Sequence, residues 1–259
     1  MHLLLLEIMK TFLILFVLVP ALCLSQERPM FSSVRLKPLK EKYNVDSITI
    51  IYPIIKLHNK LAYEKINKII RETLLPEYND EDSSIAIDSL VKLSAADGLT
   101  SMSYKSSFNK NGILSLQIFI DAVAAYPTSW QEELNFDINT GDLITMKNII
   151  KPEKYKLFRQ LVYQDKINAI KKYQIELKNY FSKKEFDKET YEWASEEVKH
   201  CMDSVSFEKF ILTGSALQIF DGCDFPHMIQ AIGPAYDLRY KLSSIRSYVR
   251  DEIFRKLTH

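Results

Sequence analysis

The sequence has few of the residues on which common enzyme families depend. Its 259 residues include only 6 Gly and 5 His, and two of the histidines, His2 and His259, are terminal. His58, His200 and His227 are therefore the candidates for internal acid/base chemistry. The sequence contains no Gly-x-Ser-x-Gly elbow, no His-Glu-x-x-His motif, no Walker loop and no Rossmann glycine fingerprint. We therefore expect no nucleotide and no other cofactor.

An excess of charge of one sign is also missing. The 34 Lys and Arg residues balance 33 Asp and Glu residues, so the formal net charge is +1. Such a chain has no overall field that would attract nucleic acid or an anionic membrane surface. Hydrophobic residues make up 47% and charged residues 26%, which is typical of soluble globular domains. We expect a folded chain without a nucleic-acid partner.

A short apolar stretch near the start has the pattern of an export signal. Met9 and a lysine precede the almost wholly apolar run Thr11–Val19, which is followed by Pro20 and small residues before Gln26. The run is shorter than the roughly 20 residues that span a bilayer, so a stable transmembrane anchor is the weaker alternative. We expect residues 1–25 to be a cleaved signal peptide and the mature protein to be periplasmic or secreted.

The remainder is expected to form one domain. Residues 26–42 are polar and proline-containing and predict a flexible lead-in, and residues 43–259 predict a single compact domain. Apolar residues at steps of three and four predict helices at about 59–75, 152–170 and 188–202, and a last helix capped by Ser243 or Ser244. Residues 78–98 indicate either a loop or a weak helix.

Alternating apolar residues predict the strands. Asn111-Gly112 is a strong hairpin signal because both residues tolerate positive φ. The fold class that follows is α+β, with an antiparallel sheet packed against helices. The expected strands are 45–52, 102–108, 114–124, 133–138, 143–146, 207–212, 216–220 and 236–241.

Two cysteines in the mature chain lie near two histidines. Cys201 follows His200, and Cys223 precedes His227 by four residues, a spacing that fits no common zinc finger. In an oxidising compartment, a Cys201–Cys223 disulfide is the plainer interpretation. Two unpaired thiols and a metal site are the alternatives, and no metal site is our expectation.

Two aromatic residues and an acidic residue near the end of the long strand form the candidate binding site. Tyr126 and Trp130 flank Pro127, with Asp121 shortly before them. If exposed, the aromatic rings would offer a stacking surface for a sugar or an anchor for a protein; if buried, they belong to the core. The adjacent pair Glu132-Glu133 predicts a solvated face rather than a catalytic dyad, because neighbours on a strand point apart.

One stretch resembles a known family. Residues 135–144 read Asn-Phe-Asp-Ile-Asn-Thr-Gly-Asp-Leu-Ile. This run is similar to the Asn-Phe-Asp-Leu-x-Thr-Gly-x-x-Leu signature of RsiV-like extracytoplasmic domains. These domains occur in the lysozyme-sensing anti-sigma factor RsiV and beside some peptidoglycan deacetylases. Tyr52-Pro53, 210–220 and 236–238 resemble other parts of that pattern, whereas Ala124–Pro127 replaces the usual Gly-Gly-Ala-His-Pro.

The resemblance implies an exported sensory or accessory domain of the cell envelope. Our first functional hypothesis is a non-enzymatic binding module that recognises an envelope protein or a peptidoglycan-type glycan through Tyr126, Trp130 and Asp121. The second is a hydrolase of cell-wall polymers that uses Asp121 with His227. The third is a structural envelope protein without catalytic function.

Overall fold

The computed structural model describes residues 29–36, 49–78, 86–123, 126–183, 187–223, 225, 229, 232–234 and 236–258. The expected signal peptide, its cleavage site and His227 lie outside these described residues. Within them, no helix combines the length and the apolar character that crossing a membrane would require.

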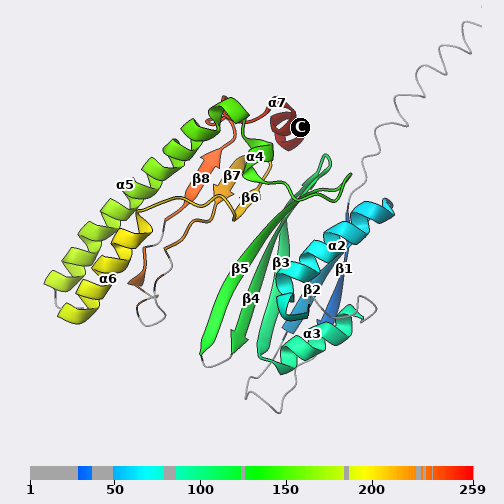
Figure 1. Cartoon of the computed structure of the whole chain (residues 1–259), viewed down its shortest axis with the longest axis horizontal. Helices are drawn as coiled ribbons and strands as arrows, with labels where there is room; N and C mark the ends of the chain where they lie inside the picture. The colour runs from blue at the N-terminus through cyan, green and yellow to red at the C-terminus, as the bar shows by residue number, and fades with distance from the viewer. Residues whose placement is uncertain are drawn as a thin grey trace, which may run out of the picture.

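A five-stranded sheet forms the first layer of the molecule (Figure 1). Its strands follow the chain order, and every neighbouring pair is antiparallel except β2 and β3. The sheet is therefore mixed rather than purely antiparallel, because the helical crossover between β2 and β3 returns the chain in the same direction. The strands are β1 (Met30–Leu36), β2 (Thr49–Lys56), β3 (Leu99–Lys110), β4 (Ile113–Val123) and β5 (Pro127–Asp137).

Strand β1 corrects the expectation of a flexible lead-in. It pairs with β2 along its whole length, from Met30 opposite Lys56 to Leu36 opposite Ile50. Phe31 stacks on Tyr104 with 5.7 Å between ring centroids, so an aromatic contact with β3 helps to hold β1 in the sheet.

Helices α2 (Lys60–Leu74) and α3 (Ile87–Ala96) cover one face of this sheet (Figure 1). Helix α2 begins where expected because the Asn59 side chain accepts a hydrogen bond from the Ala62 amide at 3.3 Å. In the described parts of 78–98, the structure has the end of the short 3-10 helix η1 (Pro76–Tyr78) and helix α3, so a helix is present there; residues 79–85 lie outside the described residues. The buried side chains on this face include Ile66, Ile70, Leu114, Leu116 and Ile118.

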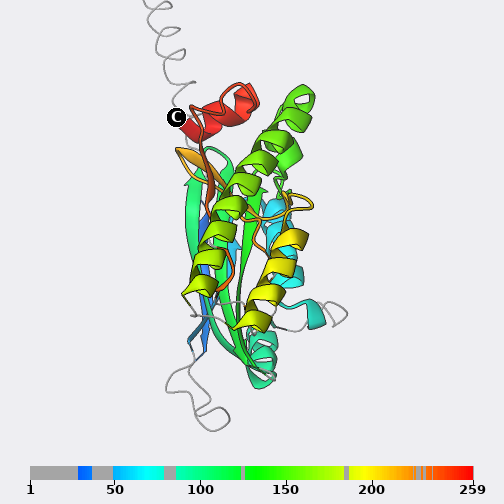
Figure 2. The same cartoon turned by 90° about the vertical axis from the view of Figure 1, so that its left-hand side faces the viewer.

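A three-stranded antiparallel sheet and a pair of long helices form the second part of the fold. Figure 2 shows α5 and α6 running next to each other, and they pack through a shared hydrophobic cluster. A separate cluster of buried residues lies between the small sheet, α5 and the C-terminal segment. The elements are α4 (Met146–Ile149), η2 (Pro152–Lys154), α5 (Tyr155–Ser182), α6 (Lys188–Cys201), β6 (Phe210–Leu212), β7 (Ala216–Ile219), β8 (Leu238–Lys241) and α7 (Asp251–Thr258).

The structure confirms the α+β class and changes several element boundaries. The expected 143–146 strand is reduced to an isolated bridge between Leu143 and Phe136, and α4 begins at Met146, where Thr145 and Asn148 form a capping box. The expected 152–170 helix continues to Ser182. The last helix begins at Asp251, after turns that follow Lys241, and not at Ser243 or Ser244.

Candidate functional site

The predicted binding residues lie where β4 ends and β5 begins, which we call the hairpin tip. Tyr126 is 66% exposed and Trp130 is 41% exposed, so the aromatic pair is on the surface. Asp121 lies opposite Ser129, whose hydroxyl donates a hydrogen bond to the Asp121 carboxylate at 2.6 Å. Trp130 lies opposite Ile120 in the adjacent register position, so it faces the other side of the sheet from Asp121. The structure therefore does not bring all three residues to one face.

A larger feature lies at the other half of β5. A cleft of about 860 Å³ is lined by residues 132–135 of β5, residues 143–147, Tyr155 and Arg159 of α5, and residues 204–210. We call it the β5 cleft. Its volume falls in the range of small-molecule sites, which is about 300–1,000 Å³. Sequence reasoning did not identify this cleft, because its walls come from segments distant in the chain.

One wall of the β5 cleft belongs to a polar face of the five-stranded sheet. Gln117 lies opposite Glu133, and Ser115 lies opposite Asn135, so these four side chains share one face. All four are buried, with exposed fractions between 0% and 6%. The intervening apolar residues point to the opposite face and pack under α2 and α3. Polar groups buried in this way are ordinarily hydrogen-bonded, so each one without a partner needs an explanation.

The small sheet covers part of this polar face and satisfies some of its groups. The Ser115 hydroxyl accepts a hydrogen bond from the Leu212 amide at 3.1 Å. The Asn135 Nδ2 donates to the Phe210 carbonyl at 2.7 Å. This contact fixes the orientation of the Asn135 amide, because the flipped side chain would place two oxygens against each other. The Asn135 Oδ1 is buried and has no hydrogen-bond partner among the described residues.

Glu133 is the second buried group without a partner. It is 6% exposed, and neither carboxyl oxygen has a hydrogen-bond partner among the described residues. Burial raises the pKa of Glu133 from 4.5 to about 7; the positive charge of Lys209 and the Gln117 side chain opposite it on β4 oppose the rise, and the negative charge of Glu132 adds to it. Near neutral pH a large fraction of this carboxyl is therefore protonated.

Glu132 and Glu133 have different environments, which corrects the expectation of a solvated face. Lys209 Nζ lies 3.1 Å from the Glu132 carboxylate and also donates to the Gln131 carbonyl at 3.0 Å. Glu132 is thus paired with Lys209, whereas Glu133 is buried and its oxygens have no hydrogen-bond partner among the described residues. The pair does not form a dyad that shares a proton. Alternation of polar residues marks this face in the sequence, but only the tertiary packing shows that it is buried.

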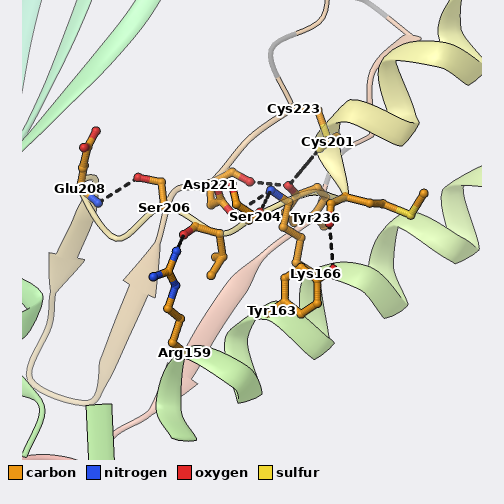
Figure 3. A network of polar contacts seen from close by, with 12 residues as sticks. Arg159, Tyr163, Lys166, Cys201, Ser204, Ser206, Glu208, Asp221, Cys223 and Tyr236 are labelled. Atoms are coloured by element: carbon orange, nitrogen blue, oxygen red, sulfur yellow. Dashed lines mark hydrogen bonds and ion pairs between the residues drawn. A yellow bond between two sulfur atoms is a disulfide. The ribbon is translucent and has the colours of Figure 1, made fainter. Parts of the chain in front are cut away.

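The 202–206 segment, which leads into the cleft wall, is held by one side of α5 (Figure 3). Tyr163 donates to the Met202 carbonyl at 3.0 Å, and Lys166 donates to the Ser204 carbonyl at 2.8 Å. Arg159 makes a longer contact of 3.5 Å with the carbonyl of residue 205. Steps of three and four place these three side chains on the same side of the helix.

The cysteines lie at the far end of the same network (Figure 3). A disulfide joins Cys201 to Cys223, with 5.2 Å between their Cα atoms. Lys166 forms a buried ion pair with Asp221 at 3.0 Å, and the Tyr236 hydroxyl donates to the Asp221 carbonyl oxygen. Burial raises the pKa of the Tyr236 phenol. The disulfide and the ion pair thus hold residues 221–223 against α5 and α6.

Comparison with known proteins gives matches at the level of structure alone. No family model and no curated protein matches the sequence. A DUF3298 family member from Bacteroides fragilis (BF2082) superposes with a TM-score of 0.56 and 13% identity, and the match covers 88% of this chain and 97% of that chain. This chain shares its fold with DUF3298 family proteins. A second, from Pseudomonas aeruginosa PAO1 (PA4972), gives a TM-score of 0.53 with the same identity and coverage.

Among the described residues, no group of three or more His, Cys, Asp or Glu side chains is arranged to hold a metal ion. A cavity of about 250 Å³ beside the disulfide contains His200, Glu197 and the Lys166–Asp221 pair. Asp221 is already paired with Lys166 and Glu197 is partly exposed to solvent, so the cavity offers less unsatisfied polarity than the β5 cleft. The β5 cleft is therefore the candidate functional site.

Proposed function

We propose that this chain is an exported, non-enzymatic binding module of the cell envelope, and that its ligand binds in the β5 cleft. The observation that supports the cleft most strongly is a pair of buried, unpartnered groups, the Glu133 carboxyl and the Asn135 Oδ1. Leaving a buried polar group without a hydrogen bond costs about 1–3 kcal/mol. These oxygens have almost no exposed surface, so a ligand must first displace the residues that cover them, and it would then recover part of that free energy by supplying the hydrogen bonds.

We also propose that the domain is of the RsiV-like type. The run 135–144, which resembles the RsiV-like signature, contributes Asn135, Leu143 and Ile144 to the wall of the cleft. Gly141 in that run has φ +76°, and a Cβ there would come within 2.9 Å of the backbone of α2. The signature residues thus have two structural roles. Asn135, Leu143 and Ile144 line the cleft, and Gly141 lets the turn pack closely against α2.

Export is supported by the sequence of residues 9–25 and by the Cys201–Cys223 disulfide, since such bonds persist in oxidising compartments. Mass spectrometry of the protein recovered from its native host tests this part. We expect a mature chain that begins at or near Gln26 and is two daltons lighter than its reduced form. An intact leader on a reduced, cytosolic chain would contradict it.

Binding accounts for the cleft better than hydrolysis does. Hydrolysis of a glycosidic bond ordinarily needs a protonated acid and a second carboxylate on opposite sides of the scissile bond. Glu133 meets the first requirement, but Glu132 is paired with Lys209 and is the strand neighbour of Glu133. The alternative hydrolase based on Asp121 with His227 depends on a residue outside the described part of the chain.

The hairpin tip remains a second candidate surface because Tyr126 and Trp130 are exposed at 66% and 41%. Exposed aromatic residues at the end of an edge strand suit stacking on a sugar ring or anchoring a protein. The partner at either surface would be an envelope protein or a peptidoglycan-type glycan. The two surfaces predict different results when the ligand is captured.

Site-specific photo-crosslinking in the native host tests the proposal. A benzophenone amino acid replaces Leu143, which lines the cleft and is 42% exposed, and a matched control replaces Leu61, which is 78% exposed on α2. We expect an adduct at position 143 and none at position 61. The adduct should be lost in a Glu133→Leu background and kept in Tyr126→Ala/Trp130→Ala.

The opposite pattern would contradict the proposal that the ligand binds in the β5 cleft. An adduct at position 143 that survives Glu133→Leu but disappears in the aromatic double variant would move the ligand to the hairpin tip. The absence of any adduct at position 143 would remove the cleft as the binding site. Digestion of the adduct with a protease or a muramidase identifies it as protein or glycan.

A further inference from the structure

The hydrogen-bonding groups of the β5 cleft restrict the chemistry of its ligand. Asn135 offers its Oδ1 as an acceptor, because that oxygen has no hydrogen-bond partner among the described residues, whereas its Nδ2 already donates to the Phe210 carbonyl. A protonated Glu133 offers one O–H donor together with acceptor capacity. A ligand that satisfies both groups must therefore donate to Asn135 and also accept from Glu133.

Charge argues against an ammonium group as the ligand. When Glu133 is protonated, the three basic side chains of the lining outnumber the remaining two acidic ones. A cation would then meet a net positive wall and would also have to remove the proton from Glu133. A neutral ligand avoids both costs. The charged residues that line the cleft are Glu132, Glu133, Glu208, Lys147, Arg159 and Lys209.

The spacing of the two groups suits an amide. Glu133 and Asn135 are two residues apart on β5 and face the same side, so their backbones are separated by roughly 6.5–7 Å. A trans amide with one hydrogen bond at its N–H and one at its C=O spans roughly 7 Å between the two partner atoms. A single hydroxyl group is too short to reach both side chains directly.

The rest of the lining can accommodate the substituents of an amide. Val205, Phe207 and Phe210 on one wall and Leu143 and Ile144 on another give the cleft apolar surface beside its polar groups. Sites for neutral organic ligands commonly combine such apolar walls with a few polar groups that fix orientation.

We propose that the β5 cleft binds a neutral secondary amide, whose N–H donates to Asn135 Oδ1 and whose carbonyl accepts from the protonated carboxyl of Glu133. This inference rests on the proposed binding function and names the chemical class of its ligand. Two sources supply such an amide, namely the acetamido group of an N-acetylated sugar and the peptide bond of an extended chain. Both share the same recognition chemistry.

Binding of small probes to the full exported chain tests the inference. The probes are diacetylchitobiose for the acetamido source, N-acetyl-dialanine methylamide for the peptide source, and fully deacetylated chitobiose as the ammonium control. Binding is followed by chemical-shift changes of the backbone amides of residues 133–135 and 204–210. We expect at least one amide probe to bind and the deacetylated sugar not to bind in the cleft.

The pH dependence provides a readout that a merely structural role of Glu133 would not change. Because the pKa of Glu133 is about 7, the protonated fraction falls about tenfold between pH 6 and pH 8, and the affinity should fall by the same factor. Glu133→Gln keeps an amide donor and an acceptor, so it should bind at both pH values without this dependence. Glu132→Gln, the matched control, should keep the dependence of the unmodified chain.

Three results would overturn the inference. The first is no binding of either amide probe at concentrations up to about 100 mM, which corresponds to an affinity too weak for recognition. The second is tighter binding of the deacetylated sugar as the pH rises, which would identify a cation site. The third is amide binding that is independent of pH in the unmodified chain. If the position-143 adduct nevertheless forms in cells, the binding function stands and only the ligand class is wrong.

Discussion

Glu133→Gln should stabilise the protein at high pH and change its stability little at low pH. The folded-state pKa of Glu133 is about 7, above its ordinary value of 4.5, because burial disfavours the charged carboxylate. The folded state therefore binds a proton that the unfolded state has released between these two values. Stability from this group is fully present below about pH 4.5 and is lost as the pH rises through 7.

The size of the effect follows from the same pKa values. A rise from 4.5 to about 7 corresponds to roughly 3 kcal/mol, at about 1.4 kcal/mol for each pKa unit. Relaxation of the cleft and entry of water make this an upper bound. A neutral Gln of similar shape avoids the cost of the buried charge. We expect Glu133→Gln to raise the free energy of unfolding by about 1–3 kcal/mol at pH 8 and by less than about 1 kcal/mol at pH 5.

Urea unfolding with the disulfide intact, followed at pH 5 and pH 8, measures this difference. Glu132→Gln is the matched control, because it removes a paired and partly exposed carboxylate on the same strand. Its effect should be within about 1 kcal/mol and should not increase with pH over this range. Equal effects of Glu133→Gln at both pH values, or a loss of stability at pH 8, would refute the assignment of a buried and titrating carboxyl.

Three further substitutions test the framework around the cleft, each by urea unfolding. Cys201→Ser/Cys223→Ser removes the cross-link between α6 and residues 221–223 and should cost about 2–4 kcal/mol, and an unchanged midpoint would contradict a structural bond. Lys166→Met leaves Asp221 buried without its cation and should cost about 3–5 kcal/mol, which Lys166→Met/Asp221→Leu should largely restore. Gly141→Ala places a side chain in a positive-φ turn beside α2 and should lower the free energy of unfolding by about 1–2 kcal/mol. A variant that is more stable than the unmodified chain would contradict the positive φ at Gly141.

Local signals in the sequence predicted local structure correctly. The Asn111-Gly112 turn has φ values of 55° and 79°, as the hairpin prediction requires. The start of α2 is fixed by Asn59, and α6 begins at Lys188 as expected. In each case the determining interaction lies within a few residues along the chain.

Features set by distant contacts could not be predicted in this way. Strand β1 lies within the polar, proline-containing stretch 26–42, and its place in the sheet depends on pairing with β2 and on the contact of Phe31 with Tyr104. Glu133 lies in an alternating polar pattern that is typical of a solvent-facing strand. Its burial depends on residues 204–210, which pack next to β5. The cleft was missed for this reason, since a covered polar face and a solvated one have the same sequence pattern.

The state of the Glu133 carboxyl is the physical basis of both the proposed site and the proposed ligand. A carbon-13 NMR titration of the side-chain carboxyls, with the Glu133 resonance assigned from its absence in Glu133→Gln, measures that state directly. The structure predicts a midpoint near pH 7, which should rise further when an amide probe is bound. A midpoint at or below the ordinary value of 4.5, unaffected by the probe, would contradict it.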